Sequence, residues 1–147
     1  MTSGASVARE PGSLHQGAGL PRPGVALRPG LVYDVPRSAW RTALLTGRFD
    51  RLNLPSVLVT GRAPVTVQRR VTNVGSRSMY YSAARWGFTS HRVEVTPAAL
   101  RIAPGESRTV RIRVSARAGT RARADSGWVA WRGANGTRVR IPVVVSP

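Results

Sequence analysis

Few residues in the chain could carry out acid–base chemistry or bind a metal ion. The sequence has two histidines, six carboxylates and no cysteine. They are His15, His91, Glu10, Asp34, Asp50, Glu94, Glu106 and Asp125. A zinc site or a catalytic set needs such side chains in close, convergent groups. The spacing suggests no such group, so we expect no catalytic residue, no metal site and no cofactor site.

Ser90 and His91 place a hydroxyl nucleophile next to a possible base. Neighbouring residues of a strand point to opposite faces of the sheet, so this pair is poorly placed for nucleophilic catalysis. Gly17 and Gly19 form a short glycine-rich stretch. No strand leads into it and no helix follows, which a phosphate-binding loop requires. The sequence therefore predicts a chain without enzymatic activity of its own.

The net charge is the strongest feature of the composition. The 147-residue chain carries a net charge of +17, and all 23 of its basic residues are arginine. One interpretation is a nucleic-acid or polyanion binder. The other is the coding bias of a G+C-rich genome, which replaces surface lysines by arginines. The absence of lysine favours the second interpretation, since nucleic-acid binders commonly use both cations.

The length fits one domain with a tail, and 41% of the residues are hydrophobic. No apolar run approaches the roughly 18 residues that cross a bilayer. The first residues, MTSGASVAREPG, contain no apolar segment typical of a signal peptide. We therefore expect no membrane association, and disulfides are excluded because cysteine is absent.

Residues 55–147 alternate between apolar and polar side chains, as expected for strands with one buried face. The residues of the apolar phase are Val65, Val67, Val71, Val93, Val95, Val110, Ile112, Val114, Val139, Ile141 and Val143. Turn signals separate these runs at Asn73–Gly75, Trp86–Gly87, Pro104–Gly105, Ala118–Gly119 and Asn135–Gly136. About seven short strands in this length predict an all-β fold, an antiparallel β-sandwich. Arginines at the alternate positions, such as Arg111 and Arg113, then lie on wet faces.

Residues 1–31 differ, because glycine and proline interrupt any period, and they are expected to form an extended arm. Residues 32–54 are expected to hold one short helix, at about 37–46, and a connection. Ser38 can cap this helix, Trp40 and Leu44 share its apolar face with Ala43, and Gly47 can end it. The preceding GLVYDV segment is apolar enough to dock on the sandwich. The helix should pack beside it.

Two further motifs have a structural and a functional interpretation. Trp128 and Trp131 lie on opposite faces of one predicted strand, so one of them must face the less buried side as a weak interaction candidate. Asn135–Gly136–Thr137 matches a glycosylation sequon. An Asn-Gly pair between alternating runs is also a hairpin turn, and this interpretation is favoured.

Several segments, in order, resemble the C-terminal fibronectin type III-like domain of subtilisin-like serine proteases. VQRRVTNVGS is similar to the family strand TVTRTVTNVG, RLNLPSV to LNYPSI, and GLVYDV to DPGLVYD. SAWRTALLTG looks like the short helix that follows the protease domain. VEVTPAALRIAPGESRTVRIRV and WVAWRGANGTRVRIPVVV resemble the paired strands and closing hairpin. The resemblance runs from about Gln16 to Val145.

The resemblance implies a fibronectin type III-like β-sandwich with an extended N-terminal arm and one short helix. It also implies a secreted protein whose partner is a subtilisin-like protease domain, which this domain stabilises while it helps to shape substrate access. Without that protease domain, an apolar surface near the helix should be left uncovered. The catalytic Asp, His and Ser motifs of such proteases, including GTSMAxP, do not occur in this sequence. Leu45–Gly47 stands where plant relatives often carry cysteine, and Thr137 where they carry histidine. An arginine-rich polyanion binder and a stand-alone adhesion module remain the alternatives.

Overall fold

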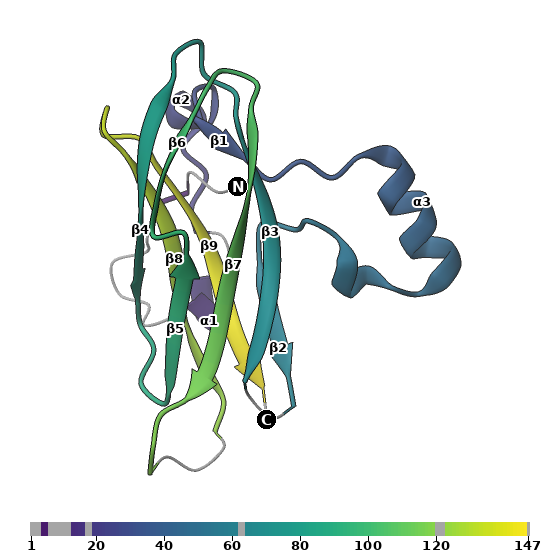
Figure 1. The fold of residues 1–147 in the computed structure, drawn as a ribbon. Coiled ribbons are helices and arrows are strands. Elements are labelled where there is room, and N and C mark those ends of the chain that lie inside the picture. Colours follow the sequence, from purple (N-terminus) through teal and green to yellow (C-terminus); the bar gives the residue numbers. More distant parts are fainter. Residues whose placement is uncertain (1–3, 6–12, 17–18, 62–63, 120–122, 147) are drawn as a thin grey trace.

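Two β-sheets pack face to face in the computed structural model, which describes residues 4–5, 13–16, 19–61, 64–119 and 123–146 (Figure 1). The strands are β1 Leu31–Val32, β2 Val57–Thr60, β3 Val65–Asn73, β4 Met79–Trp86, β5 His91–Thr96, β6 Ala99–Ile102, β7 Ser107–Ala116, β8 Asp125–Gly133 and β9 Arg138–Ser146. This arrangement confirms the predicted β-sandwich. Four helical segments precede or interrupt the strands in the described part: α1 Ser13–Gln16, α2 Pro23–Ala26, α3 Arg37–Thr46 and the 3-10 turn η1 Phe49–Arg51.

One sheet has the strand order β1-β3-β7-β5, and the other has the order β2-β9-β8-β4-β6. Every pair is antiparallel except β2 and β9, which run parallel with Val57 opposite Val143. Alternation of side chains gives the faces of a strand but not its direction, so the sequence could not predict this parallel pair. β1 and β2 are each the outer strand at one edge of their sheet.

The core lies between the two inner faces. Val71, Val110, Ile112 and Ile141 are completely buried, and Val139 is 1% exposed, as predicted. Burying an aliphatic side chain of this size contributes about 1.5–3 kcal/mol. Arg111 and Arg113, the alternate residues of β7, are exposed. The period-two pattern therefore identified the faces of this strand correctly.

Asn73 ends β3 and organises the connection to β4 in the other sheet. Its side chain is buried, its Nδ2 donates to the carbonyl oxygens of Arg77 and Ile102, and its Oδ1 accepts from Gly75 N–H. The VTNVGS segment thus turns the chain from one sheet to the other. The turn was predicted at Asn73–Gly75, and β3 ends at Asn73.

The predicted helix is present as α3, and Gly47 ends it in the left-handed conformation with φ 68°. The capping prediction for Ser38 was wrong: the N-cap is Pro36, and Ser38 lies inside the first turn. Proline fixes φ and removes an N–H group, which suits the start of a helix. Leu31 and Tyr33 are buried as predicted, but α3 projects away from the sandwich instead of packing on it (Figure 1).

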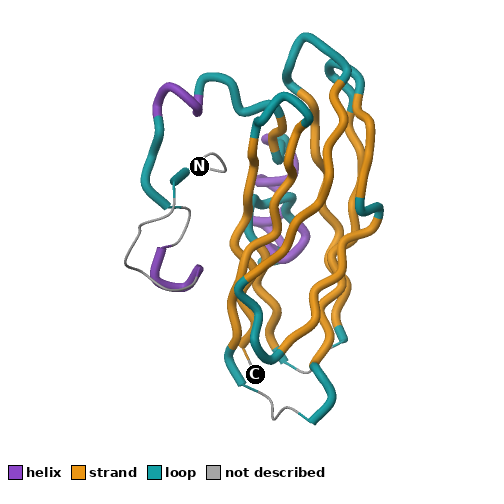
Figure 2. The backbone as a smooth tube through the Cα atoms, turned by 90° about the vertical axis from the view of Figure 1, so that its left-hand side faces the viewer, coloured by secondary structure: helices purple, strands orange, loops and turns teal. Residues whose placement is uncertain are grey.

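The described parts of the N-terminal arm lie along the outer face of the five-stranded sheet (Figure 2). α1 contacts β8 and β9, and Ala5 and Leu20 exchange two backbone hydrogen bonds. α1 and α2 are one-turn helices that the sequence pattern does not predict, because glycine and proline surround both of them. Of the described helices, none is long and apolar enough to span a bilayer.

Candidate partner-docking site

His91 and Asp125 form the one His–carboxylate pair found within the described residues. Asp125 Oδ2 lies 3.2 Å from His91 Nδ1, and both side chains are buried. The carboxylate also accepts hydrogen bonds from the backbone N–H groups of Thr89, Ser90, His91 and Ser126. It therefore fastens the β4–β5 connection to the start of β8, and it joins the two sheets at one end of the sandwich.

Ser90, the hydroxyl residue beside His91, contacts Asp125 through its backbone. Its N–H donates to the carboxylate, and its hydroxyl lies 3.5 Å from that of Thr89. Burial alone would raise the pKa of Asp125, but the hydrogen bonds from Thr89, Ser90 and His91 outweigh it and lower the pKa. Among the described residues, no group of three or more His, Cys, Asp or Glu side chains could hold a metal ion.

The segment of residues 34–54, which we call the docking lobe, carries an uncovered apolar surface. It contains α3 and η1 and stands out from the side of the sandwich where β1 and β2 are the outer strands (Figure 1). Trp40 is 41% exposed, Leu44 71%, Leu45 80% and Phe49 45%. The predicted uncovered surface near the helix is thus confirmed. Several large apolar side chains gathered on one lobe are typical of a binding surface.

The docking lobe has a small core of its own. Ala43 of α3 and Leu52 after η1 are buried, and they line the same hollow, but neither belongs to the core of the sandwich. Arg48 and Asp50 form an exposed ion pair at 3.1 Å between the helices. The lobe therefore holds its shape while its apolar outer surface stays in contact with water.

Asn53 anchors the docking lobe to the edge of β3. Its Nδ2 donates to Arg70 O at 2.7 Å, and its Oδ1 accepts from Arg70 N–H at 2.7 Å. One side chain thus makes both bonds that a neighbouring strand would make with Arg70. The same Nδ2 donates to Asp34 O at 3.0 Å, so the outgoing and returning ends of the lobe are joined at this residue.

Arg69 provides a second anchor from the inner face of β3. Its Nε donates to Leu54 O at 3.0 Å, its Nη2 to Ser56 O at 2.8 Å, and its Nη1 to Gln68 O at 2.9 Å. Burial lowers the pKa of Arg69 from its ordinary value. Within the part of the chain that the structure describes, no carboxylate forms an ion pair with Arg69.

Trp128, the tryptophan on the outer face, is not available as an interaction residue. It is 3% exposed, and the guanidinium carbon of Arg140 lies 4.0 Å from the centre of its ring. Trp131 belongs to the core and donates its Nε1–H to Tyr33 Oη at 3.1 Å. The expectation of one less buried tryptophan was wrong, because the N-terminal arm and Arg140 cover that face.

The sequence pattern missed the anchors of the docking lobe. Arg69 could have been found, because adjacent strand residues face opposite sides, so one of Arg69 and Arg70 had to point inward. The roles of Asn53 and Asp125 depend on partners 17 and 36 residues away, such as Arg70 and Thr89. The local hydrophobic periodicity of a sequence does not indicate contacts between residues so far apart.

Comparisons with known proteins agree with this geometry. Residues 51–145 match the sequence profile of the fibronectin type-III domain. A subtilisin-like protease of Glycine max is 30% identical over 155 residues, which cover 88% of this chain and 19% of that protein. Subtilisin-like protease SBT2.5 of Arabidopsis thaliana is 29% identical over 87% of this chain and 18% of its own length. The chain thus spans about a fifth of these relatives.

Solved structures support the fold alone. The CupB2 chaperone of Pseudomonas aeruginosa superimposes with a TM-score of 0.50 at 19% identity, over 63% of this chain and 53% of that chain. The periplasmic chaperone SfaE gives the same TM-score at 18% identity, over 63% of this chain and 55% of its own. The likeness concerns the sandwich architecture that positions the lobe.

Proposed function

Because the chain belongs to the fibronectin type-III domain family and aligns with subtilisin-like proteases over most of its length, we propose that it is a non-catalytic accessory domain of a subtilisin-like serine peptidase. The docking lobe packs on the catalytic domain of that peptidase. The observation that carries this proposal is the exposed apolar surface of Trp40, Leu44, Leu45 and Phe49 on an anchored lobe.

The role of the docking lobe follows from the burial of its apolar side chains against the catalytic domain. Covering apolar side chains stabilises a complex by about 25 cal/mol for each Å² removed from water, before the costs of association. The lobe would therefore stabilise the catalytic domain. A lobe that stands beside a substrate cleft would also limit which substrates enter it. We place this accessory role outside the cell, as for a secreted peptidase.

The test is binding to a subtilisin-like catalytic domain encoded by the same genome. Serine at both Leu44 and Leu45 removes apolar contact area without touching the anchors, and it should weaken binding at least about tenfold. The matched control places serine at Leu20 and Leu27, two exposed leucines of the arm, which are 56% and 84% exposed. Calorimetric titration gives both affinities. Equal affinities for the two double variants would contradict the proposal.

We also predict that the chain alone has no peptidase activity, because no nucleophile, base and orienting group converge among its described residues. The measurement is turnover of a casein substrate by the purified chain, with and without a serine-directed inhibitor. Turnover that the inhibitor abolishes would contradict the prediction.

A further inference from the structure

The first half of β3, residues 65–68, has no described strand as a neighbour on the side next to the docking lobe. On one side β3 pairs with β7 over residues 65–72. On the other side β1 covers only Thr72 and Asn73, and the Asn53 side chain covers Arg70. Neither β1 nor Asn53 covers the edge from Val65 to Gln68.

The direction of the backbone groups on this edge follows from the Asn53 contact. The N–H and C=O groups of Arg70 point away from β7, so by the alternation of an antiparallel ladder those of Thr66 and Gln68 do so as well. Gln68 O already accepts a hydrogen bond from Arg69 Nη1. For the N–H of Gln68 and for both groups of Thr66, no hydrogen bond is found within the described ranges of the chain. A strand edge with such groups is a template for another strand.

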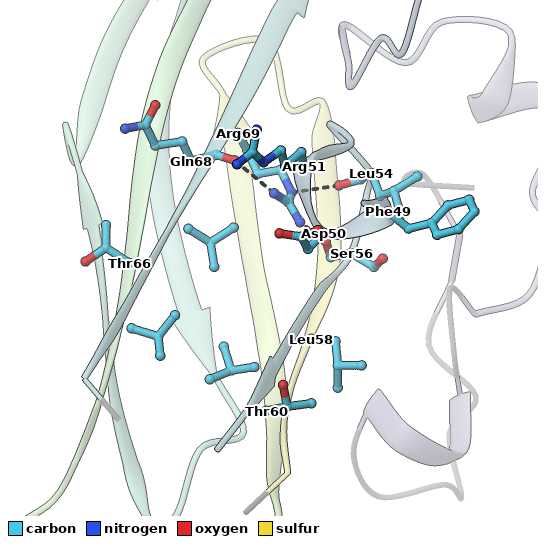
Figure 3. Close-up of a pocket in the computed structure, with 13 residues that line it drawn as sticks. Phe49, Asp50, Arg51, Leu54, Ser56, Leu58, Thr60, Thr66, Gln68 and Arg69 are labelled. Carbon is cyan, nitrogen blue, oxygen red and sulfur yellow. Dashed lines mark hydrogen bonds between the residues drawn. The ribbon is translucent and has the colours of Figure 1, made fainter. Parts of the chain in front are cut away.

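A groove of about 720 Å³ lies beside this edge, between β2 and β3 (Figure 3). Val65 and Val67 point inward yet are only partly buried, whereas Val110 and Val114 of the neighbouring β7 are fully buried. Leu58 of β2, on the other wall, is 66% exposed. The inner face therefore lacks apolar cover at this point.

The groove is also positively charged. Arg69 and Arg51 line it, and the only carboxylate among its described lining residues is Asp50, which pairs with Arg48. Arg69 is 8% exposed, and its guanidinium donates hydrogen bonds to backbone carbonyl oxygens, which do not cancel its positive charge. A buried guanidinium in this setting is complementary to a carboxylate.

We propose that this groove binds an extended polypeptide segment that pairs with the free edge of β3. The segment presents two apolar side chains to Val65 and Val67 and one carboxylate to Arg69 and Arg51. Backbone pairing gives affinity in such strand addition, and the alternate side chains give specificity. This site goes beyond the proposed function, because it assigns the chemistry of a ligand to the edge of β3 and the adjoining groove, which shares Phe49 with the apolar face of the lobe.

A second copy of the chain fits the groove less well. Pairing two β3 edges would bring Arg69 and Arg70 of each copy together, and each chain carries a net charge of +17. Like charges across an interface oppose association. The carboxylate-bearing segment is therefore the occupant that the charges favour.

The experiment uses acetylated, amidated heptapeptides in which threonine alternates with two valines and one glutamate, made in both chain orders. Nuclear magnetic resonance titration should shift the amide signals of Thr66 and Gln68. Glutamine in place of glutamate should weaken binding. Arg51→Gln should weaken binding of the glutamate peptide about threefold and leave the glutamine peptide unchanged. Arg69 is left intact, because it anchors the docking lobe.

Val67→Lys places an inward charge on the edge and should abolish the shifts, while Ser82→Lys adds the same charge to an exposed position of β4 and should not. A peptide N-methylated at every residue cannot pair in either direction and should fail to bind the unaltered protein, which keeps the test valid if Val67→Lys does not fold. Unchanged Thr66 and Gln68 signals at millimolar peptide would overturn the proposal, as would equal binding of the glutamate and glutamine peptides. Shifts that depend on protein concentration without peptide would assign the groove to a second copy instead.

Discussion

Three buried or half-buried polar side chains, those of Asn53, Arg69 and Asp125, organise the molecule by binding backbone groups. Buried polar groups need hydrogen-bond partners, and here those partners are backbone carbonyl and N–H groups of loops and strands. Each of the three residues links segments that are distant in the sequence. Only Arg69 left a trace in the sequence, as the first residue of an Arg doublet within an alternating run.

Ile112 and Arg111 are neighbours on β7 with opposite environments. Ile112→Ala should lower the free energy of unfolding by ~2–5 kcal/mol, because it leaves a cavity in a fully buried site. Arg111→Ala, on the exposed face, should change it by no more than ~0.5 kcal/mol. Urea denaturation of both variants measures the difference. Equal losses would show that the faces of β7 are assigned incorrectly.

Tyr33 should make the fold sensitive to alkaline pH. Burial raises the pKa of Tyr33 to about 12 from an ordinary value of 10.0. Above pH 10 the unfolded chain loses this proton and the folded chain keeps it, so stability is constant below pH 10 and falls between pH 10 and 12. The loss should reach about 2–3 kcal/mol.

Thermal melting from pH 8 to 12 measures this loss, with Tyr33→Phe as the control. At pH 8 the variant should be less stable than the unaltered protein, because Trp131 Nε1–H loses its acceptor. Its alkaline slope should be smaller and should retain the part due to Tyr81, whose pKa burial also raises. The same slope in both proteins would contradict the prediction.

At the scale of elements, the sequence predicted what depends on local periodicity. The faces of β3, β7 and β9, the bounds of α3 and the left-handed Gly47 follow from neighbours within a few residues. The parallel pairing of β2 with β9 and the projection of α3 did not follow, because they depend on contacts between distant segments. Of the apolar face predicted for α3, Ala43 is buried within the lobe, whereas Trp40 and Leu44 are exposed.

Asn53→Ala should loosen the docking lobe and leave the sandwich folded. The variant exposes the N–H and C=O of Arg70 and frees Asp34 O, at a cost of about 1–3 kcal/mol. Hydrogen exchange should accelerate in α3 and η1 and stay slow around Ile112 and Ile141. Asn135→Ala, in an exposed hairpin, is the matched control and should leave α3 unchanged. Uniform acceleration in the Asn53 variant would mean that the lobe and sandwich unfold together.

At the scale of the whole molecule, the positive charge is spread over both sheets. Exposed arginines occur on several strands, among them Arg92 on β5, Arg101 on β6, Arg111 on β7 and Arg132 on β8. We therefore expect weak, unspecific DNA binding. Its affinity should fall steeply as salt rises, because the free energy gained by releasing counterions from DNA then decreases. Titration of labelled duplexes at increasing salt measures this. Tight binding above ~0.2 M salt with a preference for one sequence would support a nucleic-acid function instead.

The contact between Asn53 and Asp34 has an evolutionary consequence. Because the two ends of the docking lobe meet at one point on β3, the lobe is in effect an insertion whose entry and exit are already closed. Loop-closure entropy grows slowly with length, so residues between these ends can be added, lost or replaced at little cost to the sandwich. This segment can therefore change in sequence and length while the strands that carry it keep their sequence pattern.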